Sequence, residues 1–170
     1  MTTAGGAILA FPVTSGPQEL AMSDPASPRQ LLQSLLQGIS DGRWNDLADL
    51  YAEDAVVEQP FAPAPPRRLE GREAIRAHFA AAAQGPLRLE ASKVVVHDTA
   101  DPEVVIAEFD YDGRVAPTGR AFRVANIQVL RVRDGRIVSS RDYHDHLALA
   151  AAVGRLQTLA ASIGSPQPAS

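Results

Sequence analysis

The segment that most constrains the fold runs from Gly119 to Leu147, where two runs of strand-forming residues flank the dipeptide Asp134-Gly135. Asp-Gly tolerates the positive φ angles of a two-residue turn, so the segment is predicted to form a long antiparallel hairpin. Pairing Arg133 with Arg136 sets the register, and the predicted partners are then Asp142 with Ile127, His144 with Ala125 and His146 with Arg123.

This register places a carboxylate, two imidazoles and a guanidinium on one face of the sheet. It sends Arg141 and Tyr143 to the other face, beside Asn126 and Gln128. A longer loop with a bulge would exchange the two faces, because side chains alternate with a period of two. The hairpin is therefore predicted more firmly than its register.

Composition excludes several classes of protein. A chain of 170 residues that is 45% hydrophobic is long enough for one domain with a core. A net charge of −4, with scattered basic residues, does not indicate a nucleic-acid partner. The absence of cysteine excludes disulfides and thiolate metal sites. Apolar segments are too short for a membrane span, and residues 1–10 lack the basic start of a secretory signal, so we expect a cytoplasmic protein.

The order of elements predicts one α+β domain over residues 28–163. Residues 1–27 and 164–170 are expected to be flexible tails, with Met22 an alternative start. A capping box at Ser27 opens the first helix, and a shorter one follows. The expected remainder is a strand over 55–61, a proline-rich loop over 60–68, a helix over 71–84, strands over 87–97 and 103–111, the hairpin, and a helix over 147–159. The order α-α-β-α-β-β-β-β indicates a curved antiparallel sheet with helices packed on it.

Three short motifs resemble the SnoaL-like branch of the nuclear transport factor 2-like superfamily. They are Leu50-Tyr51-Ala52-Glu53-Asp54-Ala55, Leu69-Glu70-Gly71-Arg72-Glu73-Ala74-Ile75, and Asp134-Gly135-Arg136-Ile137 followed by Arg141-Asp142-Tyr143. The resemblance covers roughly residues 28–156 and implies a cone-shaped sheet around one hydrophobic pocket, in a homodimer. The superfamily hosts isomerases, cyclases, epoxide hydrolases and non-catalytic binders, so the fold alone does not define the reaction.

Within this superfamily, the steroid-isomerase pattern does not match. Its three functional positions fall on Gln59, Leu35 and a position near Ile127. The chain is similar to the phenazine-biosynthesis A/B proteins, whose helix histidine and strand acid match His78 and Asp142. This resemblance implies that Asp142 and His78 are the catalytic pair.

The chemistry of these side chains agrees with such roles. Desolvation in an apolar pocket would raise the pKa of Asp142 into a useful range, and histidine titrates near neutrality. The alternative is a structural ion pair of Asp142 with Arg123 or Arg141. Other residues predicted to bind the substrate are Arg123, His144, Ile127, Phe61, Phe79, Phe109 and Tyr111.

Two other kinds of site are considered. The pattern Asp142-x-His144-x-His146 would place three possible metal ligands on one strand face, a spacing that could hold zinc or iron. We nevertheless expect no metal, because a helix beginning at Leu147 would turn His146 away. Glu108, Asp110 and Asp112 could supply the carboxylates that an epoxide hydrolase needs, together with Arg123, although such alternation usually marks a solvated sheet face.

The sequence thus predicts a small-molecule enzyme of specialised metabolism. We expect it to perform cofactor-free acid/base isomerisation, polyketide-type cyclisation or condensation of a cyclic, apolar substrate. The alternatives are a non-catalytic ligand-binding or dimerisation domain and an epoxide hydrolase-like enzyme.

Overall fold

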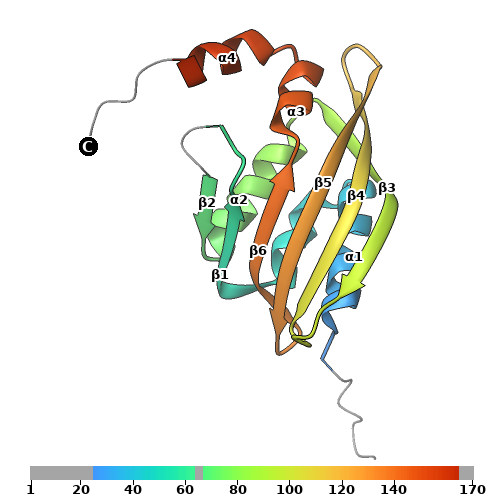
Figure 1. The fold of residues 1–170 in the computed structure, drawn as a ribbon, viewed down its shortest axis with the longest axis vertical. Coiled ribbons are helices and arrows are strands. Elements are labelled where there is room, and N and C mark those ends of the chain that lie inside the picture. The colour runs from blue at the N-terminus through green and yellow to red at the C-terminus, as the bar shows by residue number, and fades with distance from the viewer. Residues whose placement is uncertain (1–24, 64–66, 165–170) are drawn as a thin grey trace, which may run out of the picture.

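The computed structural model describes residues 25–63 and 67–164 (Figure 1). Most of the predicted tails, at 1–24 and 165–170, lie outside the described residues. The elements are α1 (Pro28–Ser40), the 3-10 helix η1 (Trp44–Leu50), β1 (Tyr51–Gln59), β2 (Arg67–Glu70), α2 (Arg72–Ala83), β3 (Leu87–Asp98), β4 (Val104–Val115), β5 (Arg120–Arg133), β6 (Arg136–His144), α3 (His146–Ala152) and α4 (Leu156–Gly164).

The predicted α+β architecture is confirmed as one curved, open sheet with helices packed on it. The strand order is β2-β1-β6-β5-β4-β3, and α1, η1 and α2 lie behind the sheet in Figure 1. One pairing differs from the prediction of an antiparallel sheet, because β1 and β6 run parallel. These two strands are joined by all the intervening elements rather than by a hairpin, so the chain can return in the same direction.

Three local differences concern the expected helices and loop. The second helix is a 3-10 helix, and β2 forms inside the end of the predicted loop, where Arg67 pairs with Gln59 of β1. The expected C-terminal helix is divided into α3 and α4, with Gly154 between them at φ +71°. A positive φ interrupts helical geometry and is favourable for glycine.

Helix α1 begins as the sequence predicts. The Ser27 hydroxyl accepts from the Gln30 amide at 3.3 Å, and the Gln30 side chain accepts from the Ser27 amide at 2.8 Å. These reciprocal bonds satisfy donors that a helix start otherwise leaves free. The buried face of α1 carries Leu31, Leu32, Leu35, Leu36 and Ile39, and it packs against the concave side of the sheet.

The β5–β6 hairpin turns at Asp134 and Gly135, with φ angles of 50° and 68°, and Arg133 pairs with Arg136 as predicted. Val132 pairs with Ile137, but Arg131 pairs with Ser139, so β6 holds one extra residue. The buried positions of β6 agree, since Ile137 and Ser140 both point inward although they are three residues apart. Such a bulge exchanges the faces of the strand beyond it.

The predicted register is therefore wrong beyond the bulge. Asp142 lies opposite Gln128 rather than Ile127, and His144 lies opposite Asn126 rather than Ala125. Asp142 shares the buried face of the sheet with Asn126 and Gln128. The bulge thus decides which side chains meet inside the cone.

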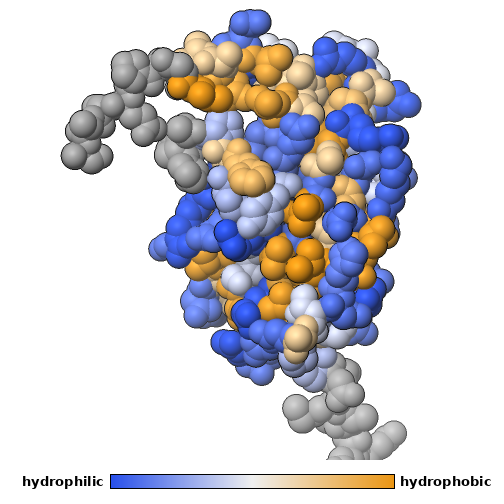
Figure 2. Space-filling model, viewed as in Figure 1, coloured by the Kyte–Doolittle hydropathy of each residue, from blue (hydrophilic) through white to orange (hydrophobic). Residues whose placement is uncertain are grey.

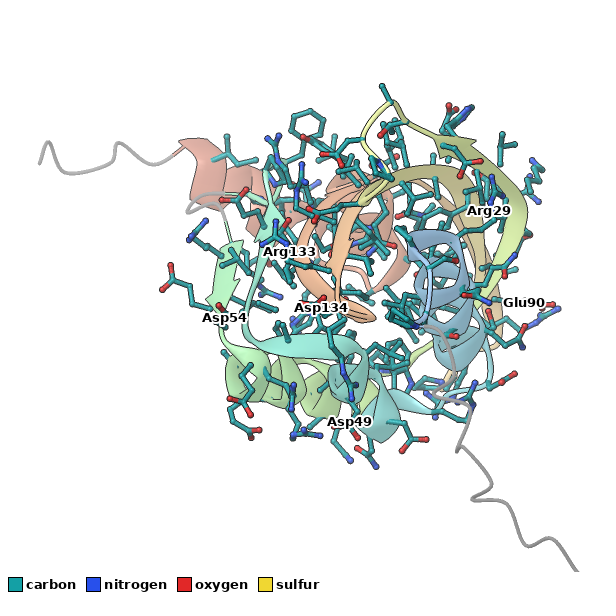
Figure 3. All side chains as sticks on the ribbon, turned by 90° about the horizontal axis from the view of Figure 1, so that it is seen from below. Arg29, Asp49, Asp54, Glu90, Arg133 and Asp134 are labelled. Atoms are coloured by element: carbon teal, nitrogen blue, oxygen red, sulfur yellow. The ribbon has the colours of Figure 1, made fainter. Side chains whose placement is uncertain are left out.

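The outer face of the sheet carries charged residues and an apolar patch. Arg123 bonds Asp112 at 2.7 Å, while Lys93 pairs with Asp110 at 3.0 Å and His97 with Glu108 at 3.0 Å. Figure 2 shows hydrophobic side chains gathered over the middle of this face. Figure 3, seen from below, shows other charged side chains, including Asp49 and Glu90, around the outside of the fold. Alternating acids on β4 therefore belong to a solvated face.

Candidate active site

A cavity of about 310 Å³ lies between the helices and the inner face of the sheet. Side chains from every helix and strand except α4 line it, which gives a pocket of the size and type used for small molecules. A wider groove of about 920 Å³ lies beside α1, but none of the buried polar side chains line it. We therefore assign the candidate site to the enclosed cavity.

Polar groups inside the fold are concentrated at this cavity. Among the described residues, five polar or charged side chains are buried: Gln59, Asn126, Gln128, Ser140 and Asp142. All of them except Ser140 line the cavity. Burying a polar group is costly unless it is hydrogen-bonded, so this concentration indicates a site rather than core packing.

Asp142 is held by neutral donors rather than by an arginine. Its Oδ1 accepts from Gln128 Nε2 at 2.9 Å and from the Ser140 hydroxyl. No described Lys or Arg side chain lies within 4.0 Å of this carboxylate, and Arg141 instead approaches Glu58, at 3.6 Å. The alternative of a structural ion pair with Arg123 or Arg141 is thus not formed. The other oxygen, Oδ2, has no protein partner in the described residues and remains available to a ligand.

His144 is oriented by an amide. Asn126 Nδ2 donates to the Val124 carbonyl at 2.8 Å, which leaves Asn126 Oδ1 to contact His144 Nδ1 at 2.6 Å. His144 Nδ1 is therefore the donor, and Nε2 of the neutral ring carries a free lone pair. Burial lowers the pKa of His144, and the Asp142 charge opposes that shift. The ring is thus a neutral base beside Asp142.

His78 lies at the mouth of the cavity, where a neighbouring groove shares Arg67, His78 and His146 with it. Its Nδ1 lies 3.4 Å from Arg67 Nη1, and because arginine only donates, Nε2 carries the proton in the neutral ring. Burial lowers the pKa of His78, and the Arg67 charge adds to that effect while Asp142 opposes it. No direct hydrogen bond joins His78 to Asp142 among the contacts of these two described residues.

Two phenols complete the polar lining. Burial raises the pKa of Tyr51 and of Tyr111, and the nearby Asp142 charge raises both further. Both hydroxyls therefore stay protonated and available as donors. The remaining wall is largely apolar and includes Trp44 and Phe79, whose rings lie 6.4 Å apart.

The structure brings together only some of the residues that the sequence singled out. Asp142, His78, His144, Phe79 and Tyr111 line the one cavity. Arg123 and Ile127 lie on the outer face of β5, whereas the bulge in β6 turns Asp142 inward, and Ile127 is 44% exposed. Phe61 is 69% exposed and packs edge-on against Tyr143, while Phe109 is buried in the core beside Tyr111.

Several cavity residues were not identified from the sequence as site residues. Tyr51, Gln59, Arg67, Asn126 and Gln128 all line the cavity. The signal for two of them was present, because Asn126 and Gln128 alternate with the strand period between the apolar Val124 and Leu130. Polar residues at inward positions of a strand indicate a site.

Neither a metal nor a membrane span can be assigned within residues 25–63 and 67–164. No cluster of three or more His, Asp or Glu side chains there has an arrangement suited to a metal ion. None of the helices in that part of the chain is both long and apolar enough to cross a membrane.

The fold and the cavity define a cone-shaped α+β domain of the small-molecule-binding type. A family model, the SnoaL-like domain, matches residues 32–140. The chain therefore belongs to the SnoaL-like family, within the nuclear transport factor 2-like superfamily.

Three similar proteins support this assignment. A PhzA/B-like protein of Pseudomonas aeruginosa is 33% identical over 133 residues, covering 78% of this chain and 94% of that protein. A solved structure of a proposed isomerase from Bacillus subtilis is 34% identical, with a TM-score of 0.69 over 75% of this chain and 92% of that one. A proposed polyketide cyclase from Xanthomonas campestris, 22% identical with a TM-score of 0.62 over 72% and 93%, shares the fold.

Proposed function

We propose that the protein is a cofactor-free acid/base enzyme that isomerises, cyclises or condenses a cyclic, largely apolar substrate inside the cone. The observation that carries the proposal is the meeting of one carboxylate and neutral imidazoles in a single cavity with an otherwise largely apolar wall. Such a pair of unlike titratable groups suits proton transfer near neutral pH. Similarity to a proposed isomerase and a PhzA/B-like protein agrees with it.

The cavity suggests a role for each polar group. Asp142 Oδ2, the oxygen without a protein partner, would accept a proton from a carbon next to a carbonyl group. Tyr51 and Tyr111 would donate hydrogen bonds to the oxygen that becomes negative, since both stay protonated. The protonated Asp142 would then return the same proton at a second position of the substrate, completing an isomerisation or the first step of a ring closure, while His78 and His144 orient the substrate beside it.

A non-catalytic ligand-binding domain is the second candidate. The observation that favours it is the lack of a direct hydrogen bond between His78 and Asp142, which line the same cavity. A binding protein needs the apolar wall and some polar contacts, but no proton relay. The epoxide hydrolase-like alternative receives no such support, because Asp110, Asp112 and Arg123 form ion pairs on the outer face.

Deuterium exchange tests the proposal without knowledge of the natural substrate. α-Tetralone, a bicyclic ketone with acidic hydrogens beside its carbonyl, is incubated with the protein in D₂O, and loss of the C2 proton signal is followed by NMR. We expect exchange above the buffer rate for the wild type and at least a hundredfold slower catalysed exchange for Asp142→Asn.

The matched control is Asp112→Asn, which makes the same substitution on the outer face. This variant should exchange at the wild-type rate. Equal catalysed rates for the wild type and Asp142→Asn would remove Asp142 from the chemistry. Binding of α-tetralone without any catalysed exchange would favour the ligand-binding candidate.

A further inference from the structure

The mouth of the cavity holds an arginine whose charge is not balanced by a nearby acid. Arg67 begins β2 and lines the cavity, and its guanidinium contacts the imidazole of His78. Among the described residues, no carboxylate lies within 4.0 Å of it. Arg68, the next residue, faces the other side of the strand and pairs with both Glu58 and Glu70. Of the two arginines in β2, Arg68 is thus neutralised by acids, whereas Arg67, at the cavity, is not.

A second unsatisfied group lies at the same mouth. His146 is the first residue of α3, and α3 stands at the same end of the fold as the start of β2 (Figure 1). Its Nε2 is buried and is the only such side-chain nitrogen or oxygen without a hydrogen-bond partner in the described part of the chain. A buried polar atom without a partner destabilises the fold, so its retention indicates that it binds a ligand atom.

The charge of Arg67 acts on both histidines at this mouth. The Arg67 charge lowers the pKa of both His78 and His146, in each case after the larger effect of burial. The other groups that act on these two rings are His144, Asp142 and Asp145. An anion placed between the rings and the guanidinium would reverse the effect of Arg67 on both histidines.

We propose that Arg67, His78 and His146 form a subsite for a carboxylate group, so that the substrate is a cyclic carboxylic acid whose ring enters the apolar interior. The inference deepens the proposed function and rests on the same cavity. The planar fork of an arginine matches a carboxylate with two parallel hydrogen bonds, and imidazole nitrogens supply further donors. The carboxylate stays at the mouth, and the ring lies between it and Asp142.

Two test compounds of one ring size separate this subsite from simple apolar binding. Benzoate carries the carboxylate, and benzyl alcohol is its neutral counterpart. Trp44 lines the cavity and is the only tryptophan of the chain, so its fluorescence reports binding to the full-length protein. We expect benzoate to bind at least tenfold more tightly than benzyl alcohol at pH 7.5.

Variants then assign the preference to Arg67. Arg67→Gln should reduce benzoate affinity at least tenfold and leave benzyl alcohol affinity unchanged, whereas Arg67→Lys should keep part of the preference. Arg68→Gln is the matched control, because it removes an equal charge one residue away on the other side of β2 and should preserve the preference. Thermal melting of each variant verifies that it is folded.

The outcomes distinguish this inference from the proposed function. Equal affinity for the two compounds, no detectable benzoate binding, or the same benzoate loss in Arg67→Gln and Arg68→Gln would overturn the subsite. These results would not affect the deuterium exchange of a neutral ketone. Conversely, an Arg67-dependent preference for benzoate would establish the subsite even if no exchange were catalysed.

Discussion

Asp142→Asn is expected to leave the fold stable, because the structure surrounds Asp142 with neutral donors. Asparagine retains one oxygen that can accept from Gln128 and Ser140. A hydrogen bond to a charged group contributes roughly 1.5–3 kcal/mol and a neutral one about 1 kcal/mol, so weakening two of them loses roughly 1–4 kcal/mol. Removing a buried charge returns several kcal/mol of desolvation. Asp142 is 8% exposed, so the two effects nearly cancel and the net change should stay within about 1 kcal/mol.

Asp142→Ala provides the contrast. It removes the acceptor and leaves the Ser140 hydroxyl and one Gln128 hydrogen without a partner, at a cost of about 1–3 kcal/mol for each stranded donor. Urea unfolding at pH 7.5 and 25 °C measures the free energy and the m-value for both variants and the wild type. The alanine variant should be at least about 2 kcal/mol less stable than the asparagine variant.

Two results would refute this reasoning. A loss of roughly 3 kcal/mol or more in Asp142→Asn would mean that a cation depends on this carboxylate, as in a broken buried ion pair. Equal stability of the asparagine and alanine variants would mean that the contacts with Gln128 and Ser140 contribute nothing measurable.

The remaining predictions concern pH, the bulge, assembly and metal. Burial lowers the pKa of His78, His144 and His146, so they stabilise the fold fully above about pH 6.5 and progressively less as the pH falls toward their folded-state values. Urea unfolding between pH 7.5 and 5 should show this decline, and His144→Gln should flatten it; an unchanged slope would contradict the assignment. Deleting Val138 removes the extra residue of β6 and preserves the strand pairs beyond it, so Asp142 should stay inward opposite Gln128 and the variant should still fold; a loss of roughly 4 kcal/mol or more in the same unfolding assay would show that the bulge itself is needed. We propose a homodimer across the outer sheet face, in which case light scattering should give a dimer mass that Ile127→Glu reduces to a monomer; a wild-type monomer at micromolar concentration would count against it. EDTA should leave the melting temperature unchanged, whereas stoichiometric zinc lost together with stability would reveal a metal site.

Local sequence signals determined the elements of this fold. The capping box at Ser27 and the spacing of leucines specify α1, and Asp134-Gly135 specifies the turn of the hairpin, because both depend on residues close in the chain. The helix position of His78 and its orientation toward the interior also follow from spacing, as does the inward face of Phe79. The α+β class and the SnoaL-like resemblance were therefore predictable.

Tertiary structure decided which side chains share the cavity. The extra residue in β6 allows both Ile137 and Ser140 to be buried while the strand pairing continues on either side of it. No local sequence motif predicts this bulge. This one-residue shift moves Asp142 from Ile127 to Gln128 and leaves Arg123 outside. The position of Arg67 at the cavity likewise depends on the pairing of β2 with β1 at the edge of the sheet. Periodicity specifies that a strand has two faces, but only long-range pairing decides which of them is enclosed.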